Sequence, residues 1–292
     1  MANPILRQKL AAGEFIVAPG LQDGIAAVVA NKVGFDIVYG SGYWTTASAH
    51  GLPDAGIASV TQMVERMAML VRVCQGAVIA DADTGFGGLL NVHHTVRAYE
   101  NAGVTAIQIE DQEFPKKCGH TPFKRLIPLA DMVDKIKVAR DARRDDNFLI
   151  IARTDARQSE GTDGVLRRLT AYAEAGADIL FPEALVSDAE MQQVCAALSK
   201  PVLANMADGG LTPIRDAETL RRLGYAMAIF PAMTSLAAAA AMAVALRHLK
   251  ATGSSLSADI KLFDFKEFCA LIGFEEVWAF ERKWAPPDRQ QS

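Results

Sequence analysis

The segment ENAGVTAIQIED, residues 100–111, contains the pattern that decides the fold of this chain. A stretch of helical character leads to a glycine, which is followed by a short apolar run and then by polar residues. The same pattern returns in NKVGFDIVYGSG (31–42), AEAGADILFPEA (173–184) and RRLGYAMAIFPA (221–232). Glycine directly after a helix suits a left-handed terminal position, and a short apolar run suits a strand buried on both faces. The sequence therefore predicts a repeated helix–strand unit.

Four further apolar runs lie before or between these segments: FIVAPG (15–20), AVIADAD (77–83), FLIIARTD (148–155) and PVLANM (201–206). Amphipathic segments of helical length separate most of the runs, at residues 60–72, 91–102, 129–140, 164–174 and 188–198. Alternating strands and helices form parallel sheets, and eight such units favour an α/β fold of the (β/α)8 TIM-barrel type. The alternative is an open doubly wound sheet, which is disfavoured because no GxGxxG turn follows the first run.

Composition and charge exclude several classes of protein. The chain has 292 residues, 50% of them hydrophobic, and a net charge of −4. This amount of apolar side chain excludes disorder as the main state, and the charge predicts no nucleic-acid partner. The four cysteines form no CxxC pair, so neither a disulfide framework nor a structural zinc site is expected.

One uncharged segment, residues 225–246, is long enough to span a bilayer. It contains Pro231, Thr234 and Ser235, and much of the rest is alanine, so we interpret it as a buried strand, a break and a buried helix. The first residues also lack the apolar stretch of a signal peptide. We therefore expect a cytoplasmic protein without a membrane partner.

Polar side chains end almost every apolar run, and the acids among them suggest a metal site. Asp81 and Asp83 are two residues apart, so their side chains point the same way from a strand. A cation removes the repulsion between such like charges, and oxygen ligands suit Mg²⁺ or Mn²⁺ more than zinc. Glu110 ends the next run and Asp54 closes the segment GLPD (51–54), which completes the candidate metal site.

The segment PKKCGH, residues 115–120, places Cys118 beside two lysines and a histidine. These neighbours are expected to lower the pKa of the thiol, which could then serve as an acid, a base or a nucleophile. The surrounding loop, residues 113–124, is long and polar and is predicted to be a lid. Arg153 at the end of another run suits bidentate carboxylate binding. The alternatives are an incidental loop cysteine and an arginine that pairs with a neighbouring acid.

Together these motifs resemble a known family. KKCGH (116–120) resembles the KKCGH/KRCGH signature of the isocitrate lyase and phosphoenolpyruvate mutase superfamily. The other landmarks follow in the same order: SG (41–42), GLPD (51–54), DADTGFG (81–87), IEDQ (109–112), ARTD (152–155), FPEA (181–184) and ANM (204–206). The length is similar to that of the short branch, which includes 2-methylisocitrate lyase, 2,3-dimethylmalate lyase, the petal death protein, oxaloacetate hydrolase and carboxyphosphoenolpyruvate mutase.

The resemblance implies roles for individual residues. Asp81 and Asp83 would hold Mg²⁺, with Asp54 and Glu110 reaching it largely through water. The implied catalytic residues are Cys118 as general acid, with Arg153, Lys117 and His120. The implied substrate-binding residues are Tyr39, Ser41, Gly42, Tyr43, Gly119, Arg153, Glu183 and Asn205.

The reaction implied by the resemblance is cleavage of the C2–C3 bond of a small 2-hydroxy acid. The substrate would be a dicarboxylate or tricarboxylate of the 2-methylisocitrate or 2,3-dimethylmalate type, and the products a 2-oxo acid such as pyruvate plus a carboxylate. Tyr43 and bulky Trp44 follow Ser-Gly where such lyases usually carry another glycine, which favours a smaller or less charged C3 substituent. The alternatives are a phosphoenolpyruvate-type or carboxyphosphoenolpyruvate-type phosphonomutase, an oxaloacetate hydrolase and a non-catalytic barrel.

The C-terminal residues exceed what one barrel needs. Residues 254–292 carry apolar side chains at helical spacing and would expose them if left unpaired. We predict one barrel domain over residues 1–292, in which 254–292 form a helical extension that packs on a neighbouring subunit. The resemblance implies a homotetramer, built as a dimer of helix-swapped dimers.

Overall fold

Eight parallel strands occupy the eight apolar runs of the sequence in this computed structural model, which describes residues 2–121, 123–257 and 259–285. They are β1 (Ile16–Leu21), β2 (Ile37–Gly40), β3 (Ala77–Asp81), β4 (Ala106–Glu110), β5 (Leu149–Thr154), β6 (Ile179–Pro182), β7 (Leu203–Asn205) and β8 (Met227–Phe230). The strand order is β6-β5-β4-β3-β2-β1-β8-β7, and a single bridge between Leu180 and Val202 joins the two ends of this sheet. The predicted (β/α)8 barrel is confirmed, and the open sheet is excluded.

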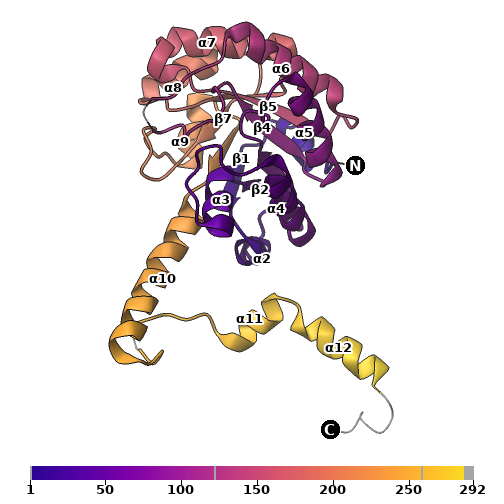
Figure 1. Ribbon diagram of the computed structural model, residues 1–292, viewed down its shortest axis with the longest axis vertical. Helices are drawn as coiled ribbons and strands as arrows, with labels where there is room; N and C mark the ends of the chain where they lie inside the picture. Colours follow the sequence, from indigo (N-terminus) through magenta and orange to yellow (C-terminus); the bar gives the residue numbers. More distant parts are fainter. Residues whose placement is uncertain (1, 122, 258, 286–292) are drawn as a thin grey trace. The chain divides into compact units, whose positions relative to one another are not determined.

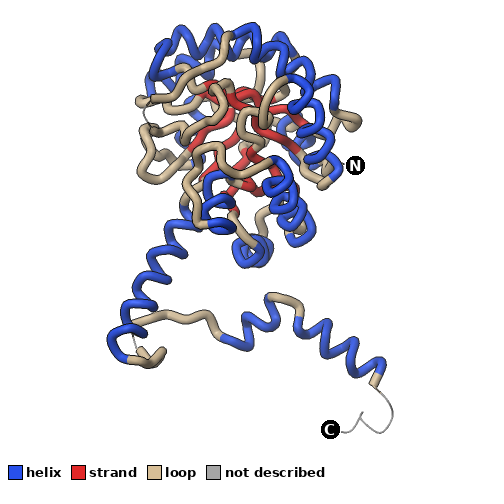
Figure 2. The backbone as a smooth tube through the Cα atoms, in the orientation of Figure 1, coloured by secondary structure: helices blue, strands red, loops and turns tan. Residues whose placement is uncertain are grey.

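Helices connect the strands and surround them (Figures 1 and 2). They are α2 (Gly24–Val33), α3 (Gly42–His50), α4 (Val60–Val73), α5 (Leu89–Asn101), α6 (Leu129–Ala142), α7 (Arg157–Ala175), α8 (Asp188–Ala197) and α9 (Ala217–Leu223). The glycines of the repeated pattern have positive φ angles between 86° and 110°, as predicted, at Gly34, Gly103, Gly176 and Gly224. On α4, Met63, Met67 and Leu70 are buried at helical spacing, so one apolar stripe attaches the helix to the barrel.

The inside of the barrel follows the two-residue period of a strand. Ile37 and Tyr39 on β2 and Ile79 on β3 belong to one buried cluster inside the barrel. Leu6 of α1 (Ile5–Ala11) joins this cluster, and the same helix pairs Lys9 with Asp36 just before β2, so α1 covers the N-terminal ends of the strands.

At the opposite end of the barrel, the next inward position on several strands is polar. Asp81 comes two residues after the core residue Ile79, and Arg153 comes two residues after Ile151. Glu183 has the same relation to Phe181. The alternation that fills the core therefore also delivers charged side chains to the C-terminal mouth of the barrel.

The chain divides into two units, Met1–Leu236 with the barrel and Ala237–Ser292. The second unit contains most of α10 (Met233–Thr252), together with α11 (Phe265–Leu271) and α12 (Phe274–Trp284). Aromatic rings pair within this unit, as in Phe274–Trp278 with centroids 5.8 Å apart, but no described residue of α11 or α12 is buried. Residues 258 and 286–292 of the predicted extension lie outside the described residues.

The expectation of a buried helix after β8 is wrong for the single chain. Met242, Val244 and Leu246 of α10 are 57%, 47% and 63% exposed. An apolar composition predicts that a helix needs a covering surface, but not that this surface belongs to the same chain. Within the part of the chain that the structure describes, neither α10 nor any other helix is long and apolar enough to cross a membrane.

Candidate active site

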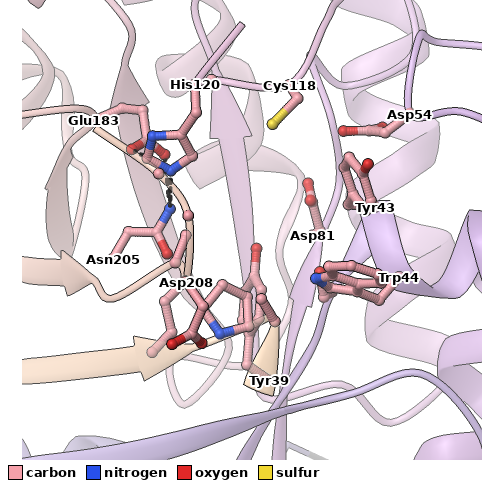
Figure 3. Close-up of a pocket in the computed structure, with 18 of the residues that line it drawn as sticks. Tyr39, Tyr43, Trp44, Asp54, Asp81, Cys118, His120, Glu183, Asn205 and Asp208 are labelled. Carbon is pink, nitrogen blue, oxygen red and sulfur yellow. Dashed lines mark hydrogen bonds and ion pairs between the residues drawn. The ribbon is translucent and has the colours of Figure 1, made fainter. Parts of the chain in front are cut away.

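A cavity of about 330 Å³ lies at the C-terminal ends of the strands (Figure 3). The predicted site residues that line it are Tyr39, Ser41, Tyr43, Asp54, Asp81, Glu110, Lys117, Cys118, Gly119, His120, Arg153, Glu183 and Asn205. The other two lie directly behind: the Gly42 N–H donates to Asp81 Oδ2 (3.3 Å), and Asp83 Oδ1 is 3.0 Å from Lys116 Nζ, whose side chain lines the cavity. Loop 113–124 and six different strand ends thus contribute to one site.

The four acids of the predicted metal site form one side of this cavity. Asp81 Oδ1 accepts from the Asp83 N–H (3.0 Å) and from Gln108 Nε2 (3.4 Å). Burial, helped by the charges of Asp81 and Asp54 and opposed by the charge of Lys116, raises the pKa of Asp83 to about 7. Burial likewise raises the pKa of Glu110. These crowded carboxylates need a positive partner to remain ionised together.

The same acids fit a hard divalent cation such as Mg²⁺. Every candidate ligand is an oxygen, and Glu110 Oε1 is buried without a hydrogen-bond partner. No group of three acidic, histidine or cysteine side chains among the described residues is arranged to hold a metal unaided. Mg²⁺ usually binds one or two carboxylates and keeps several waters, so it does not require three of these side chains in direct contact.

Lys116 is the charged residue that the sequence analysis missed. Its side chain is only 3% exposed, and its Nζ lies 2.5 Å from Asp54 Oδ1 and 3.0 Å from Asp83 Oδ1. Lys117, which was named instead, is exposed, and its backbone is bound on both sides by the side chain of Gln112 (2.8 and 3.0 Å). A signal was available, because Lys116 and Cys118 are two residues apart and share one side of an extended segment.

Cys118 lies in the cavity as a half-buried thiol, and its expected pKa shift is wrong in direction. Burial raises the pKa of Cys118, although a hydrogen bond from the His120 backbone and the charge of Arg153 oppose this. Desolvation of a thiolate outweighs its positive neighbours here, and Asp54 and Glu183 add to the rise. The thiol therefore keeps its proton at neutral pH, which suits a proton donor.

Opposite the acid cluster, a second polar group surrounds Arg153. Its Nη2 is 3.2 Å from Glu183 Oε2, which also accepts from Asn205 Nδ2 (3.0 Å). His120 Nε2 lies 3.4 Å from Glu183 Oε1. Figure 3 shows His120, Glu183 and Asn205 on one side of the cavity, Asp54 and Asp81 on the other, and Cys118 between them.

The start of α3 supplies a third feature, a helix N-terminus beside the cavity. Ser41 precedes the helix and its side chain makes no capping hydrogen bond, while the Gly42 N–H donates to Asp81 Oδ2. Free N–H groups at a helix N-terminus attract anions such as carboxylates. A side chain at Gly42 would begin 2.7 Å from Asp81 Oδ2, so this close approach requires glycine. Trp44, which the sequence placed beside the substrate-binding segment, also lines the cavity, as do residues that were not predicted, among them Asp208, Gly210 and Leu236.

Clustered acids, an arginine and a cysteine-bearing loop at the C-terminal mouth of a (β/α)8 barrel are typical of an enzyme active site. Comparison with known proteins supports this class. Residues 6–250 match the family described as phosphoenolpyruvate phosphomutase. The chain belongs to the phosphoenolpyruvate mutase/isocitrate lyase superfamily.

Relatives with named activities span nearly the whole chain. It is 42% identical to the 2,3-dimethylmalate lyase of Eubacterium barkeri over 280 residues, which is 96% of this chain and 97% of that protein. It is 41% identical to the 2-methylisocitrate lyase of Aeropyrum pernix over 286 residues, or 98% and 91% of the two chains.

Solved structures of proteins with related names have the same fold along nearly the whole chain. A complex of oxaloacetate acetylhydrolase with 3,3-difluorooxalacetate has a TM-score of 0.90 and 32% identity, covering 95% of each chain. A complex of phosphonopyruvate hydrolase with oxalate and Mg²⁺ has a TM-score of 0.87 and 28% identity, covering 98% of this chain and all of the other.

Proposed function

We propose that this protein is a Mg²⁺-dependent carbon–carbon lyase. Its substrate is a 2-hydroxy dicarboxylate or tricarboxylate of the 2,3-dimethylmalate or 2-methylisocitrate type, and its products are a 2-oxo acid such as pyruvate and a second carboxylate. The observation that carries the proposal is the position of the protonated Cys118 thiol in one cavity with the acid cluster and Arg153. The names of the two relatives that are 41–42% identical support it.

The acid cluster is the proposed metal site. Asp81 and Asp83 would hold Mg²⁺, and Asp54 and Glu110 would reach it largely through water. When bound, the ion supplies Lewis-acid stabilisation for negative charge on the substrate's 2-oxygen. The Mg²⁺ complex of phosphonopyruvate hydrolase, a structure similar to this chain, supports this choice over other metals.

The remaining residues hold the substrate and deliver a proton. Ser41, Gly42 and Tyr43 at the start of α3 bind the carboxylate of the 2-oxo acid portion. Arg153 binds the same portion, while Glu183, Asn205 and the loop residues Gly119 and His120 hold the second carboxylate. The 2-hydroxyl group loses its proton to solvent and becomes the carbonyl of the 2-oxo acid, while the electron pair of the C2–C3 bond passes to C3. The Cys118 thiol protonates C3, and the resulting thiolate regains a proton from solvent.

A substrate panel tests the proposed function. With Mg²⁺, the enzyme is expected to release pyruvate from 2,3-dimethylmalate or 2-methylisocitrate, measured by coupling to lactate dehydrogenase, and EDTA should stop this release. Conversion of oxaloacetate to acetate and oxalate would instead favour the hydrolase alternative, to which the similarity to oxaloacetate acetylhydrolase gives weight. Pyruvate release from neither hydroxy acid would contradict the lyase.

Free thiols and exposed apolar side chains suggest where and how the protein works. All four cysteines are free, as expected in the reducing cytoplasm, where we place this activity.

We also propose that residues 254–292 pack on a neighbouring subunit, in a homotetramer of two helix-swapped dimers. Phe265, Phe280 and Trp284 are 78%, 66% and 66% exposed in the single chain, and burial in an assembly would remove them from water.

Truncation after Gly253 is expected to reduce the size of the assembly, because the apolar contacts of α11 and α12 are lost. Light scattering after gel filtration would measure the molar mass. Full-length protein with Trp278→Asp, at a residue 47% exposed, checks that the effect comes from the lost surface rather than from misfolding. An unchanged number of subunits in both variants, calculated from the molar mass of each chain, would rule out packing of this extension between subunits.

A further inference from the structure

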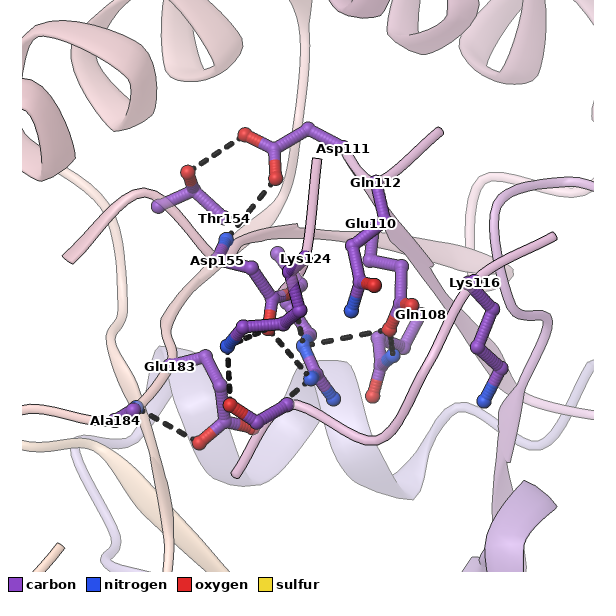
Figure 4. A network of polar contacts seen from close by, with 12 residues as sticks. Gln108, Glu110, Asp111, Gln112, Lys116, Lys124, Thr154, Asp155, Glu183 and Ala184 are labelled. Carbon is purple, nitrogen blue, oxygen red and sulfur yellow. Dashed lines mark hydrogen bonds and ion pairs between the residues drawn. The ribbon is translucent and has the colours of Figure 1, made fainter. Parts of the chain in front are cut away.

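Asp155, at the end of β5, binds two cations that come from different parts of the site (Figure 4). Arg153 grips it with two hydrogen bonds, Nε to Oδ2 and Nη2 to Oδ1, both 3.0 Å long. Lys124, from loop 113–124, places its Nζ 3.1 Å from Oδ1. The Asp155 carboxylate is fully buried, and it does not line the substrate cavity. One carboxylate thus connects the arginine of the barrel mouth with the loop above it.

The barrel holds Asp155 in place through a second acid. The Asp155 N–H donates to Asp111 Oδ1 (3.0 Å), and Thr154 Oγ1 donates to Asp111 Oδ2 (2.6 Å). Tyr172 and Arg168 on α7 also donate to Asp111 Oδ2 (2.8 and 3.3 Å). The turn that carries Asp155 is therefore attached to β4 and α7, and it is a fixed point rather than a mobile one.

The loop lies directly on this fixed point. Lys124 donates a second hydrogen bond to the carbonyl of Gly119, the residue after Cys118. A Cβ atom at Gly119 would lie 2.1 Å from Arg153 Nη2 and 2.9 Å from Asp155 Oδ1, so the loop backbone contacts the Arg153–Asp155 pair itself. Lys124 therefore links the position of the Cys118 segment to Asp155.

Charge makes this link dependent on one side chain. Arg153 is also close to Glu110 (Nε–Oε2 3.4 Å) and Glu183 (Nη2–Oε2 3.2 Å). If Asp155 lost its charge, the guanidinium group could therefore reorient toward these other carboxylates. Although burial alone would raise it, the charges of Arg153 and Lys124 lower the pKa of Asp155 to about 2. The carboxylate is thus charged throughout the neutral pH range, and both cations stay bound to it.

We propose that Asp155 is a positioning residue that couples closure of loop 113–124, through Lys124, to the orientation of Arg153 in the substrate cavity. Asp155 reaches no substrate itself; it orients the arginine that does and holds the loop that carries the acid Cys118. This role rests on the proposed lyase function, but the loop contacts that define it can be measured without any substrate.

Two variants separate the two halves of this role. Lys124→Gln removes the charge that binds the loop to Asp155 and to the Gly119 carbonyl but leaves the Arg153–Asp155 pair, so we expect kcat to fall about tenfold or more with little change in KM. Asp155→Asn removes the negative charge from both contacts and one of the two acceptor oxygens, so KM should also rise about tenfold or more because Arg153 loses its orientation. Lys124→Arg keeps the charge and should restore most of kcat.

Limited proteolysis of the ligand-free protein is the second readout. Trypsin can cut after the exposed Lys117 and Arg125, which remain in every variant. We expect faster cleavage at both sites in Lys124→Gln and Asp155→Asn, and a rate near that of the wild type in Lys124→Arg. The effects of the two substitutions should be less than additive in the double variant, because both remove the Asp155–Lys124 contact. Lys137→Gln, which breaks an exposed ion pair with Asp134, is the matched control.

The outcomes are distinct. Wild-type cleavage rates and an unchanged kcat in Lys124→Gln would overturn the proposal, as would equal loss of kcat in Lys124→Arg. If Asp155→Asn fails to fold, Lys124→Gln and Lys124→Arg still decide it. If the wild-type enzyme cleaves no substrate of the panel, the lyase function fails, while faster proteolysis of the variants would still support the Asp155–Lys124 link.

Discussion

Replacing Cys118 by serine is expected to reduce 2-oxo acid release by about 10³-fold, within the range that a positioned general acid contributes. The thiol lies in the cavity between the acid cluster and the Glu183 group, and burial raises its pKa, so it holds a transferable proton at neutral pH. A serine hydroxyl is a far weaker acid in the same position. Since the side chains are nearly equal in size, KM should change little.

The pH dependence of kcat in the wild-type enzyme is an independent test of the proton-donor role of Cys118. A general acid works in its protonated form, so kcat should persist as the pH rises and fall only when the pH passes the pKa of Cys118. Because burial raises this pKa, the fall should lie at higher pH than an ordinary cysteine would give. Cys269→Ser, at a cysteine outside the cavity, is the control. Full turnover by Cys118→Ser would remove the acid role.

The second large effect is expected from Lys116→Met. Removing one partner of a buried ion pair leaves an uncompensated charge, which typically costs about 3–5 kcal/mol of unfolding free energy. Asp54 and Asp83 both lose the ammonium group that lies within 3.0 Å of them. The loop that carries Cys118 also loses an anchor, and a misplacement of about 1 Å can cost about 10²-fold in kcat.

Urea unfolding with and without Mg²⁺ measures this effect and tests the acid cluster at the same time. If these acids bind Mg²⁺, the ion should recover part of the stability lost in Lys116→Met. Lys117→Met, one residue along the loop and exposed, is expected to stay within about 0.5 kcal/mol of the wild type. Equal losses for the two variants would show that the burial of Lys116 has no energetic consequence.

Most of the barrel could be predicted because its information is local. Each strand carries its own apolar run, and the glycine before four of the runs requires a conformation that other residues avoid. The strand-end site residues were also predictable, since Asp81, Arg153 and Glu183 continue the inward positions of their strands. The alternation of inward and outward side chains along a strand can be counted in the sequence. In a closed barrel, this alternation decides which side chains reach the mouth.

What could not be predicted depends on how the loop folds back. Adjacent lysines look equivalent in the sequence, and the choice between Lys116 and Lys117 is made by contacts with Asp54 and Asp83 from distant segments. The direction of the Cys118 pKa shift depends on burial in the folded site, which its charged neighbours in the sequence do not reveal. The exposure of α10 could not be predicted either, because an apolar composition does not say whether the same chain covers the helix.

The single bridge between β6 and β7 has a consequence for ligand binding. Among the described residues, backbone pairing at this junction is the single Leu180–Val202 bridge, in which the Leu180 N–H donates to the Pro201 carbonyl (2.9 Å). Above this bridge, Asn205 Nδ2 of β7 donates to Glu183 Oε2, just after β6, at 3.0 Å. A hydrogen bond between two cavity side chains therefore supplements the sparse backbone pairing of β6 and β7. A substrate carboxylate that contacts both Asn205 and Glu183 would add a further link between β6 and β7. Substrate binding would then stabilise the closed barrel at this junction.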